Sequence, residues 1–277
     1  MLEKLRKHNL YLKPEKCAFK QSKIEFLGVI LKNGTVQMDP AKVRGIADWP
    51  PPQNITDIHS FLGFTGFYCY FIPNYSLIAW PLIQLTWKNF PFNWDQSCTW
   101  AFKQLKSLMC AKPILQQPDY TKAFFLTTDA LAYSMGAILL QEGEPNPRTQ
   151  NPMLCPITYY SNTFTLTEKN CDIYEREFLG VLKALTYFRP HITATEIPVT
   201  ILTDHANLTH WKATWKVNRQ VARWFAKLQD YNLIIKHMPG KIHTAPDMLS
   251  RPPGADCSKD DNTNIVLLPP SMFITTT

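Results

Sequence analysis

Two short apolar runs in this chain end in the same pair of residues, Thr-Asp. The run AFFLTTD ends at Asp129, and the run VTILTD ends at Asp204. Runs of this length that are rich in β-branched and aromatic residues are typical of strands buried on both faces. If the two strands are parallel neighbours, their carboxyl ends meet at one edge of a sheet. The pattern therefore predicts a sheet with a parallel pair of strands and two carboxylates close together at its edge.

The order of elements around these runs predicts a mixed sheet. The expected strands are Ala123–Asp129, Gly136–Gln141, Ile157–Ser161, Val199–Asp204 and Leu233–Met238. One long helical stretch, EKNCDIYEREFLGVLKAL, separates the third strand from the fourth, and a helix near Asn218–Tyr231 separates the fourth from the fifth. A short last helix is expected at Asp247. This order favours an α/β fold in which helices cover the sheet.

The first 118 residues follow a different pattern. The run FLGVILKNGTVQM predicts two short strands joined at Asn33-Gly34, which is a strong hairpin signal. Three helices are predicted after it: Asp39–Trp49, Thr56–Phe71 and Asp95–Pro113. Pro118–Tyr120 mark the expected boundary with the sheet, and the polar segment GADCSKDDNTN beyond Pro253 is expected to be a linker.

A third acid, Glu177, lies within the long helical stretch. Thr165 and Glu168 match a capping box at the start of that stretch. Glu177 borders the apolar stripe, and the small residues Gly180 and Ala184 beside it allow a close approach to a sheet. Burying a lone carboxylate is costly, so it needs a partner such as a metal ion. The alternative is a partly exposed Glu bonded to a neighbouring Lys.

Carboxylates gathered at one place repel each other unless cations neutralise them. Oxygen ligands favour a hard ion such as magnesium or manganese. Such ions, in pairs, are the usual machinery for cutting phosphodiester bonds. The candidate metal ligands and catalytic residues are Asp129, Glu177, Asp204 and Asp247.

The distribution of charge favours a polyanionic partner. The first 112 residues hold fourteen Lys and Arg against seven Asp and Glu, so the whole net charge of +7 lies there. The segment Lys212–Lys241 has seven basic residues and one acid, with Trp residues between them. Mixed basic and aromatic residues suit phosphate contacts and base stacking. The predicted contacts are Lys212, Arg219 and Arg223. Core packing explains the Trp residues equally well, and a solvated surface is the alternative for the charges.

The cysteines and the hydropathy of the chain bear on its cellular compartment. The seven cysteines form no CxxC pair, which argues against a disulfide framework and against a zinc site. A reducing compartment is therefore expected. Met1 is followed by a polar segment, so no secretory signal is expected, and the protein is predicted to be intracellular, in the cytoplasm or nucleus. The uncharged stretch between Asp57 and Lys88 is interrupted by Gly and Pro, so aromatic helices joined by a turn are favoured over a membrane helix.

Several runs, in order, resemble those of one family. FLGVILKNGTVQMDPAKVRGIADWPPPQNITDIHSFLGFTGFYCYFIPNYSLIAWPL is similar to the end of the palm and the thumb of gypsy-type LTR-retrotransposon reverse transcriptases. FLTTDALAYSMGAILLQ, SNTFTLTEKNCDIYEREFLGVLKAL, TDHANL and HMPGKIHTAPDMLSRP resemble that family's ribonuclease H domain. The resemblance implies a palm remnant at 1–37, a helical thumb module at 38–118, a ribonuclease H-like domain at 119–253 and a tail at 254–277. The implied fold of that domain is a five-stranded mixed sheet flanked by helices.

The same resemblance implies a function. The four acids would bind two magnesium ions, or manganese, and cut the RNA strand of an RNA–DNA hybrid. The rest of a Pol polyprotein is the implied partner, and the sequence sets no oligomeric state. No Tyr-x-Asp-Asp motif occurs, so no polymerase activity is expected from this chain alone. Two rival interpretations stay open: a nucleic-acid-binding module that does not cut, and an inactive transposon relic.

Overall fold

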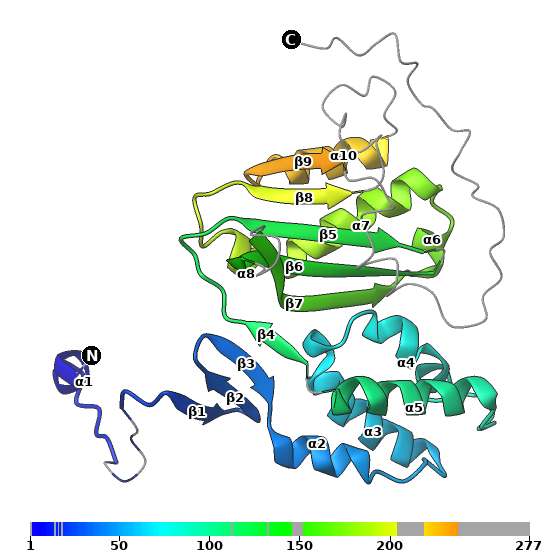
Figure 1. Ribbon diagram of the computed structural model, residues 1–277. Helices are drawn as coiled ribbons and strands as arrows, with labels where there is room; N and C mark the ends of the chain where they lie inside the picture. The colour runs from blue at the N-terminus through cyan, green and yellow to red at the C-terminus, as the bar shows by residue number, and fades with distance from the viewer. Residues whose placement is uncertain are drawn as a thin grey trace.

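The computed structural model shows two modules, each built around its own hydrophobic core (Figure 1). The first core is formed by residues between Val29 and Leu115, and the second by residues between Phe124 and Leu228. β4 (Ile114–Gln116) belongs to the sheet of the first module and leads directly into the second. The structure describes residues 2–13, 15, 17, 19–111, 113–131, 133–145, 152–203 and 219–237.

An antiparallel sheet of the order β1-β2-β3-β4 opens the first module, after the short helix α1 (Leu2–Lys7). Its first three strands are β1 (Lys23–Phe26), β2 (Val29–Lys32) and β3 (Thr35–Met38). The predicted hairpin is confirmed, because Lys32 pairs with Thr35 across Asn33 and Gly34. Both turn residues have positive φ angles, 47° and 73°, as a tight two-residue hairpin requires.

Helices make up the rest of the first module: α2 (Pro40–Ala47), α3 (Ile55–Phe67), the 3-10 turn η2 (Cys69–Phe71), α4 (Tyr75–Gln84) and α5 (Gln96–Cys110). Asp39, Asn54 and Asp95 cap α2, α3 and α5 by accepting backbone hydrogen bonds. The uncharged stretch between Asp57 and Lys88 holds most of α3 and all of α4, which confirms the prediction of helices joined by a turn there; the bounds of α4, which contains Pro81 and has no side-chain cap, were not predicted. Among the described residues, no helix is both long and apolar enough to cross a membrane.

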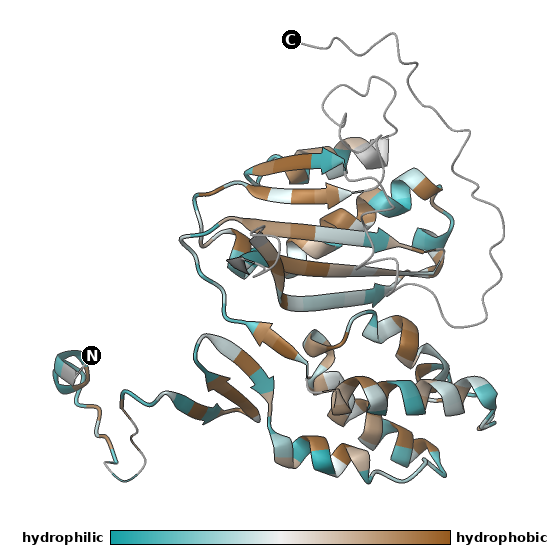
Figure 2. Cartoon of the chain, in the orientation of Figure 1, coloured by the Kyte–Doolittle hydropathy of each residue, from teal (hydrophilic) through white to brown (hydrophobic). Residues whose placement is uncertain are grey.

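The second module is a mixed sheet of the order β7-β6-β5-β8-β9, which confirms the predicted five-stranded arrangement. The strands are β5 (Phe124–Ala130), β6 (Ser134–Pro145), β7 (Pro152–Thr163), β8 (Val199–Thr203) and β9 (Leu233–His237). β5 and β8 are parallel neighbours, as the two Thr-Asp runs predict, and β8 and β9 are also parallel. In Figure 2 hydrophobic residues are prominent on β6, β8 and β9.

Helices α6 (Leu166–Lys169), α7 (Ile173–Tyr187), α8 (Arg189–Ile192) and α10 (Arg219–Leu228) accompany this sheet. The prediction of one long helix from the capping box onward is wrong. The capping box of Thr165 and Glu168 is present, but it starts only the four-residue α6. Asp172 then caps a second helix, α7, by accepting a hydrogen bond from Glu175 N–H. The stretch therefore forms two helices, each with its own N-cap.

Candidate functional site

Asp129 is the last residue but one of β5, which ends at Ala130. Its pairing partner on the adjacent strand β6 is Gly136. On the other side, β5 pairs in parallel with β8 as far as Thr127 and Leu202. Asp204 is two residues beyond Leu202 in the sequence, as Asp129 is two residues beyond Thr127, but Asp204 lies outside the described residues. We call the edge at which β5 and β8 end the carboxyl edge of the sheet.

The side of β5 that carries Asp129 faces away from α7. Phe124 and Leu126 belong to the core beneath α7, whereas Thr127 and Asp129 line a cavity on the opposite face. Pro73 and Asn74 from the first module close this cavity, whose volume is about 10 Å³. That is room for about one water molecule, so a cation with its ligands does not fit there. Any metal ion bound by Asp129 therefore lies beyond the end of the strand, at the carboxyl edge.

Glu177 reaches the same edge from the other face. Gly180 of α7 packs on β5, where a methyl group at Gly180 would lie 3.7 Å from Cβ of Ala130. The C-terminal end of α7 lies near the start of β5, since Phe188 and Phe124 belong to one core. Tyr120 also links the two, because it meets Phe124 edge-to-face and stacks on His191. α7 therefore runs antiparallel to β5, and Glu177, almost one turn before Gly180, lies toward the carboxyl edge.

Burial distinguishes Glu177 from an ordinary helical Glu. Only 7% of the residue is exposed, so the alternative of a partly exposed Glu is wrong. It borders the core residues Phe178 and Val181, which are 1% and 2% exposed. A carboxylate in such surroundings is costly unless it is paired or bound to a cation.

The four predicted metal ligands are thus placed in part. Asp129 and Glu177 lie toward the same end of β5 but on its two opposite faces, and Asp204 and Asp247 lie outside the described residues. Within the described part of the chain, no three His, Cys, Asp or Glu side chains form a group that could hold a metal ion. The two placed acids fit a hard divalent ion, because both offer carboxylate oxygens and Glu177 is largely shielded from water.

The predicted nucleic-acid contacts are placed less completely. Lys212 lies outside the described residues, and α10 begins at Arg219, whose side chain is also outside them. Arg223 is exposed on α10. Its neighbour Trp224 is partly buried and stacks on Phe178, with ring centroids 6.0 Å apart. This Trp therefore serves the core.

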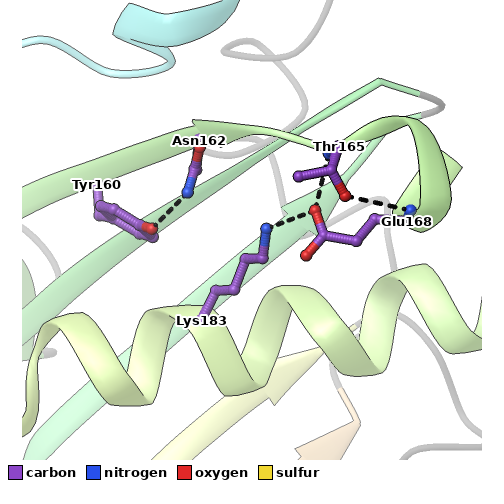
Figure 3. Close-up of polar contacts among 5 residues, drawn as sticks. All are labelled: Tyr160, Asn162, Thr165, Glu168 and Lys183. Carbon is purple, nitrogen blue, oxygen red and sulfur yellow. Dashed lines mark hydrogen bonds and ion pairs between the residues drawn. The ribbon is translucent and has the colours of Figure 1, made fainter. Parts of the chain in front are cut away.

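A groove between β7, α7 and α10 was not predicted from the sequence. It has a volume of about 310 Å³, and its lining includes Lys183, Tyr187, Trp224 and Lys227. Figure 3 shows the polar contacts at its rim: Asn162 donates to Tyr160, and Lys183 Nζ lies 2.8 Å from a Glu168 carboxylate oxygen. No sequence signal joins the lining residues of α7 with Trp224 and Lys227 of α10, because these come together only when α10 packs against α7.

Lys183 and Lys227 both line this groove, but their surroundings differ. Partial burial raises the pKa of Glu168, but hydrogen bonds from Lys183 and from the Thr165 backbone lower it more, so the net pKa is below its ordinary value. Burial raises the pKa values of Tyr160 and Tyr187, which stack at 4.2 Å and stay neutral. Lys183 is therefore engaged by Glu168, while Lys227 is exposed.

Comparisons with known proteins find related sequences. Residues 119–231 match the family described as an RNase H-like domain found in reverse transcriptase. The retrovirus-related Pol polyprotein from transposon opus of Drosophila melanogaster is 34% identical over 91% of this chain and 26% of its own length. The Pol polyprotein from transposon 412 of the same fly is 33% identical over 90% of this chain and 19% of its own length. The transposon Tf2-3 polyprotein of Schizosaccharomyces pombe is 30% identical over 91% and 18%, respectively.

Solved structures show the same fold. The foamy viral protease-reverse transcriptase in complex with an RNA/DNA hybrid has a TM-score of 0.66 at 20% identity, over 88% of this chain and 32% of that one. The same protein in complex with double-stranded DNA has a TM-score of 0.64 at 20% identity, over 79% of this chain and 45% of that one. The chain thus spans about a quarter or less of the length of the curated relatives, and less than half of these structures.

Proposed function

Because this chain belongs with the Pol polyproteins of gypsy-type retrotransposons and carries their RNase H-like domain, we propose that it is a nuclease. Its substrate would be an RNA–DNA hybrid, of which it cuts the RNA strand. The reaction would depend on two divalent ions, magnesium or manganese. The observation that carries the proposal is the burial of Glu177 at the edge where the strand of Asp129 ends.

The acids would divide the work by their position. Asp129 lies at the end of a central strand, where its backbone pairs with Gly136 of β6, two residues beyond the last described pair of β5 with β8. Glu177 approaches from the helix above, where the close packing of Gly180 on Ala130 sets its height over the strand. Asp204 and Asp247 would complete the set. When bound, the ions would activate a water molecule and stabilise the leaving oxygen.

Basic residues would hold the hybrid beside this edge. Arg223 and Lys227 are exposed on α10, and Lys212 and Arg219 precede them in the sequence. Their charges would bind phosphates, and the A-form-like shape with its 2′-hydroxyl groups would be the feature recognised. The other parts of a Pol polyprotein are the proposed partners, because the relatives are much longer.

The test is cleavage of a labelled RNA–DNA hybrid with Mg²⁺, with Mn²⁺ or with EDTA. We expect cutting that needs metal and that Asp129→Asn abolishes. Glu196→Gln is the matched control, because this acid is exposed on the second module away from the carboxyl edge. Binding of the hybrid without any cutting would instead identify a binding module, and neither binding nor cutting would indicate a relic.

A further inference from the structure

The start of α4, which belongs to the first module, contacts β7 in the sheet of the second module. The backbone N–H of Ser76 donates to Oγ of Ser161 on β7 at 2.8 Å. The Ser76 hydroxyl donates to the Ser161 carbonyl at 2.9 Å, and the Ser161 hydroxyl donates to Ser76 Oγ at 3.1 Å. These three bonds use both hydroxyl groups, so the two serines form a specific contact between the modules.

Ser161 belongs to a row of residues that ends at Asp129. Ser161 pairs with Gly136 across β7 and β6, and Gly136 pairs with Asp129 across β6 and β5. Asn74, two residues before Ser76, covers the middle of this row. A methyl group at position 136 would collide with Oδ1 of Asn74 and lie 3.1 Å from its Cγ. The position therefore needs glycine because the amide of Asn74 occupies that space.

Asn74 is held there at some conformational cost. It has a left-handed backbone, with φ of 50° and ψ of 34°, and is 9% exposed. It is the N-cap residue of α4, yet its side chain makes no capping hydrogen bond to that helix. Asn normally provides such a bond at this position. Its amide instead lines the small cavity with Asp129 and the buried hydroxyl of Thr127.

We propose that Asn74 is a positioning residue for Asp129, so that the first module completes the site of the second. This inference rests on the proposed function. The contact between Ser76 and Ser161 seats α4, and the amide of Asn74 then fills the face of β5 opposite α7. The cavity left between Asn74 and Asp129 holds about one water molecule, so an ion bound by Asp129 would have to lie toward the carboxyl edge. Groups that orient a metal ligand in this way contribute about 10–100-fold to metal affinity or activity.

The first test is Asn74→Gly, which removes the amide but keeps the left-handed backbone accessible. We expect Mn²⁺ affinity, measured by calorimetry, to fall about 10-fold or more, and kcat to fall with it while KM for the hybrid changes less than about twofold. Asn89→Gly is the control, because Asn89 also has a positive φ, 64°, but is exposed in the first module. Unchanged Mn²⁺ affinity in Asn74→Gly would overturn the proposal.

A second test uses the contact between the serines. With Ser76→Cys and Ser161→Cys combined, a disulfide is expected to form, since the two hydroxyl oxygens are 3.1 Å apart. The oxidised protein should bind Mn²⁺ and cut the hybrid as well as the reduced protein does. Loss of cutting on oxidation, restored by reductant, would mean that the first module blocks the site, and failure to form the disulfide would refute the docking itself. The two single-cysteine variants are the controls.

These results are distinguishable from failure of the proposed function. A wild-type chain that neither binds Mn²⁺ nor cuts the hybrid would refute the nuclease and the positioning role together. A wild-type chain that does both, with an Asn74→Gly variant that is equally good, would refute the positioning role alone.

Discussion

At the scale of single residues, the buried carboxylate of Glu177 is the feature on which the proposed metal site depends. It is largely buried beside Phe178 and Val181, where a hydrophobic residue would pack at lower cost. Gly180 and Ala184 on the same helix keep α7 close to the sheet. Retaining a carboxylate at such a position is expected where function outweighs stability.

This role predicts how metal changes the stability of the chain. Mn²⁺ at about 100 times its Kd should raise the free energy of unfolding of the wild type by about 2.7 kcal/mol, because a ligand that binds only the folded state stabilises it. Glu177→Gln keeps the size of the side chain but removes its charge, so its melting temperature should respond little to Mn²⁺. Thermal unfolding with and without Mn²⁺ measures this, with Glu196→Gln as control; an equal response in Glu177→Gln would exclude Glu177 as a ligand.

At the scale of elements, the break between α6 and α7 is stabilised by one ion pair. Lys183 of α7 reaches Glu168 of α6, and both side chains are about four-fifths buried. Glu168 also accepts the backbone N–H of Thr165 in the capping box. Glu168 therefore links the two helices at the rim of the groove in Figure 3.

The pair predicts a pH dependence with a definite sign. The pKa of Glu168 is lowered from 4.5, so the pair stabilises the folded state above about pH 4.5, and this contribution is lost as the pH falls through the lowered pKa. Lys183→Met should cost about 1 kcal/mol at pH 7 and progressively less below pH 4.5. Lys103→Met on the exposed face of α5 is the control. Denaturant unfolding at pH 7 and pH 3.5 checks this, and an equal cost at both values would contradict it.

The sequence predicted elements where local chemistry decides them. The Asn33-Gly34 hairpin and the caps of Asp39 and Asp95 follow from residues that are near each other in the chain. The parallel pairing of β5 and β8 was instead predicted from the shared Thr-Asp ending of two runs that are far apart in the sequence. The break before α7 was missed because Asp172 had to be recognised as a second cap inside a stretch with helical spacing. The start of helix α4 was not predicted because contacts with β7, rather than its own cap, hold it.

At the scale of the whole molecule, the contact between the modules is what the sequence could not supply. Ser76 and Ser161 are 85 residues apart, and the need for glycine at position 136 arises from Asn74 in the other module. Two of the four acids could be placed at the carboxyl edge, whereas Asp204 and Asp247 stay predictions. Such long-range pairs depend on how two separately formed cores dock.

The basic surface of the second module predicts a salt dependence of hybrid binding. Arg223 is exposed on α10, so Arg223→Ala should weaken binding similarly for all hybrid sequences. It should also make the slope of log K against log salt concentration shallower by about one. Titrations from 50 to 200 mM salt measure this slope, with Lys103→Ala in the first module as control. An unchanged slope would remove Arg223 from the interface.

The central claim is that Asp129 and Glu177 share divalent ions with the two acids outside the described residues. Anomalous diffraction from crystals grown with Mn²⁺ tests it most directly. The account predicts peaks at the carboxyl edge, with oxygen atoms of Asp129 and Glu177 within about 2.0–2.4 Å of the same ion. Mn²⁺ bound elsewhere, with these two carboxylates facing different surfaces and sharing no ion, would contradict it.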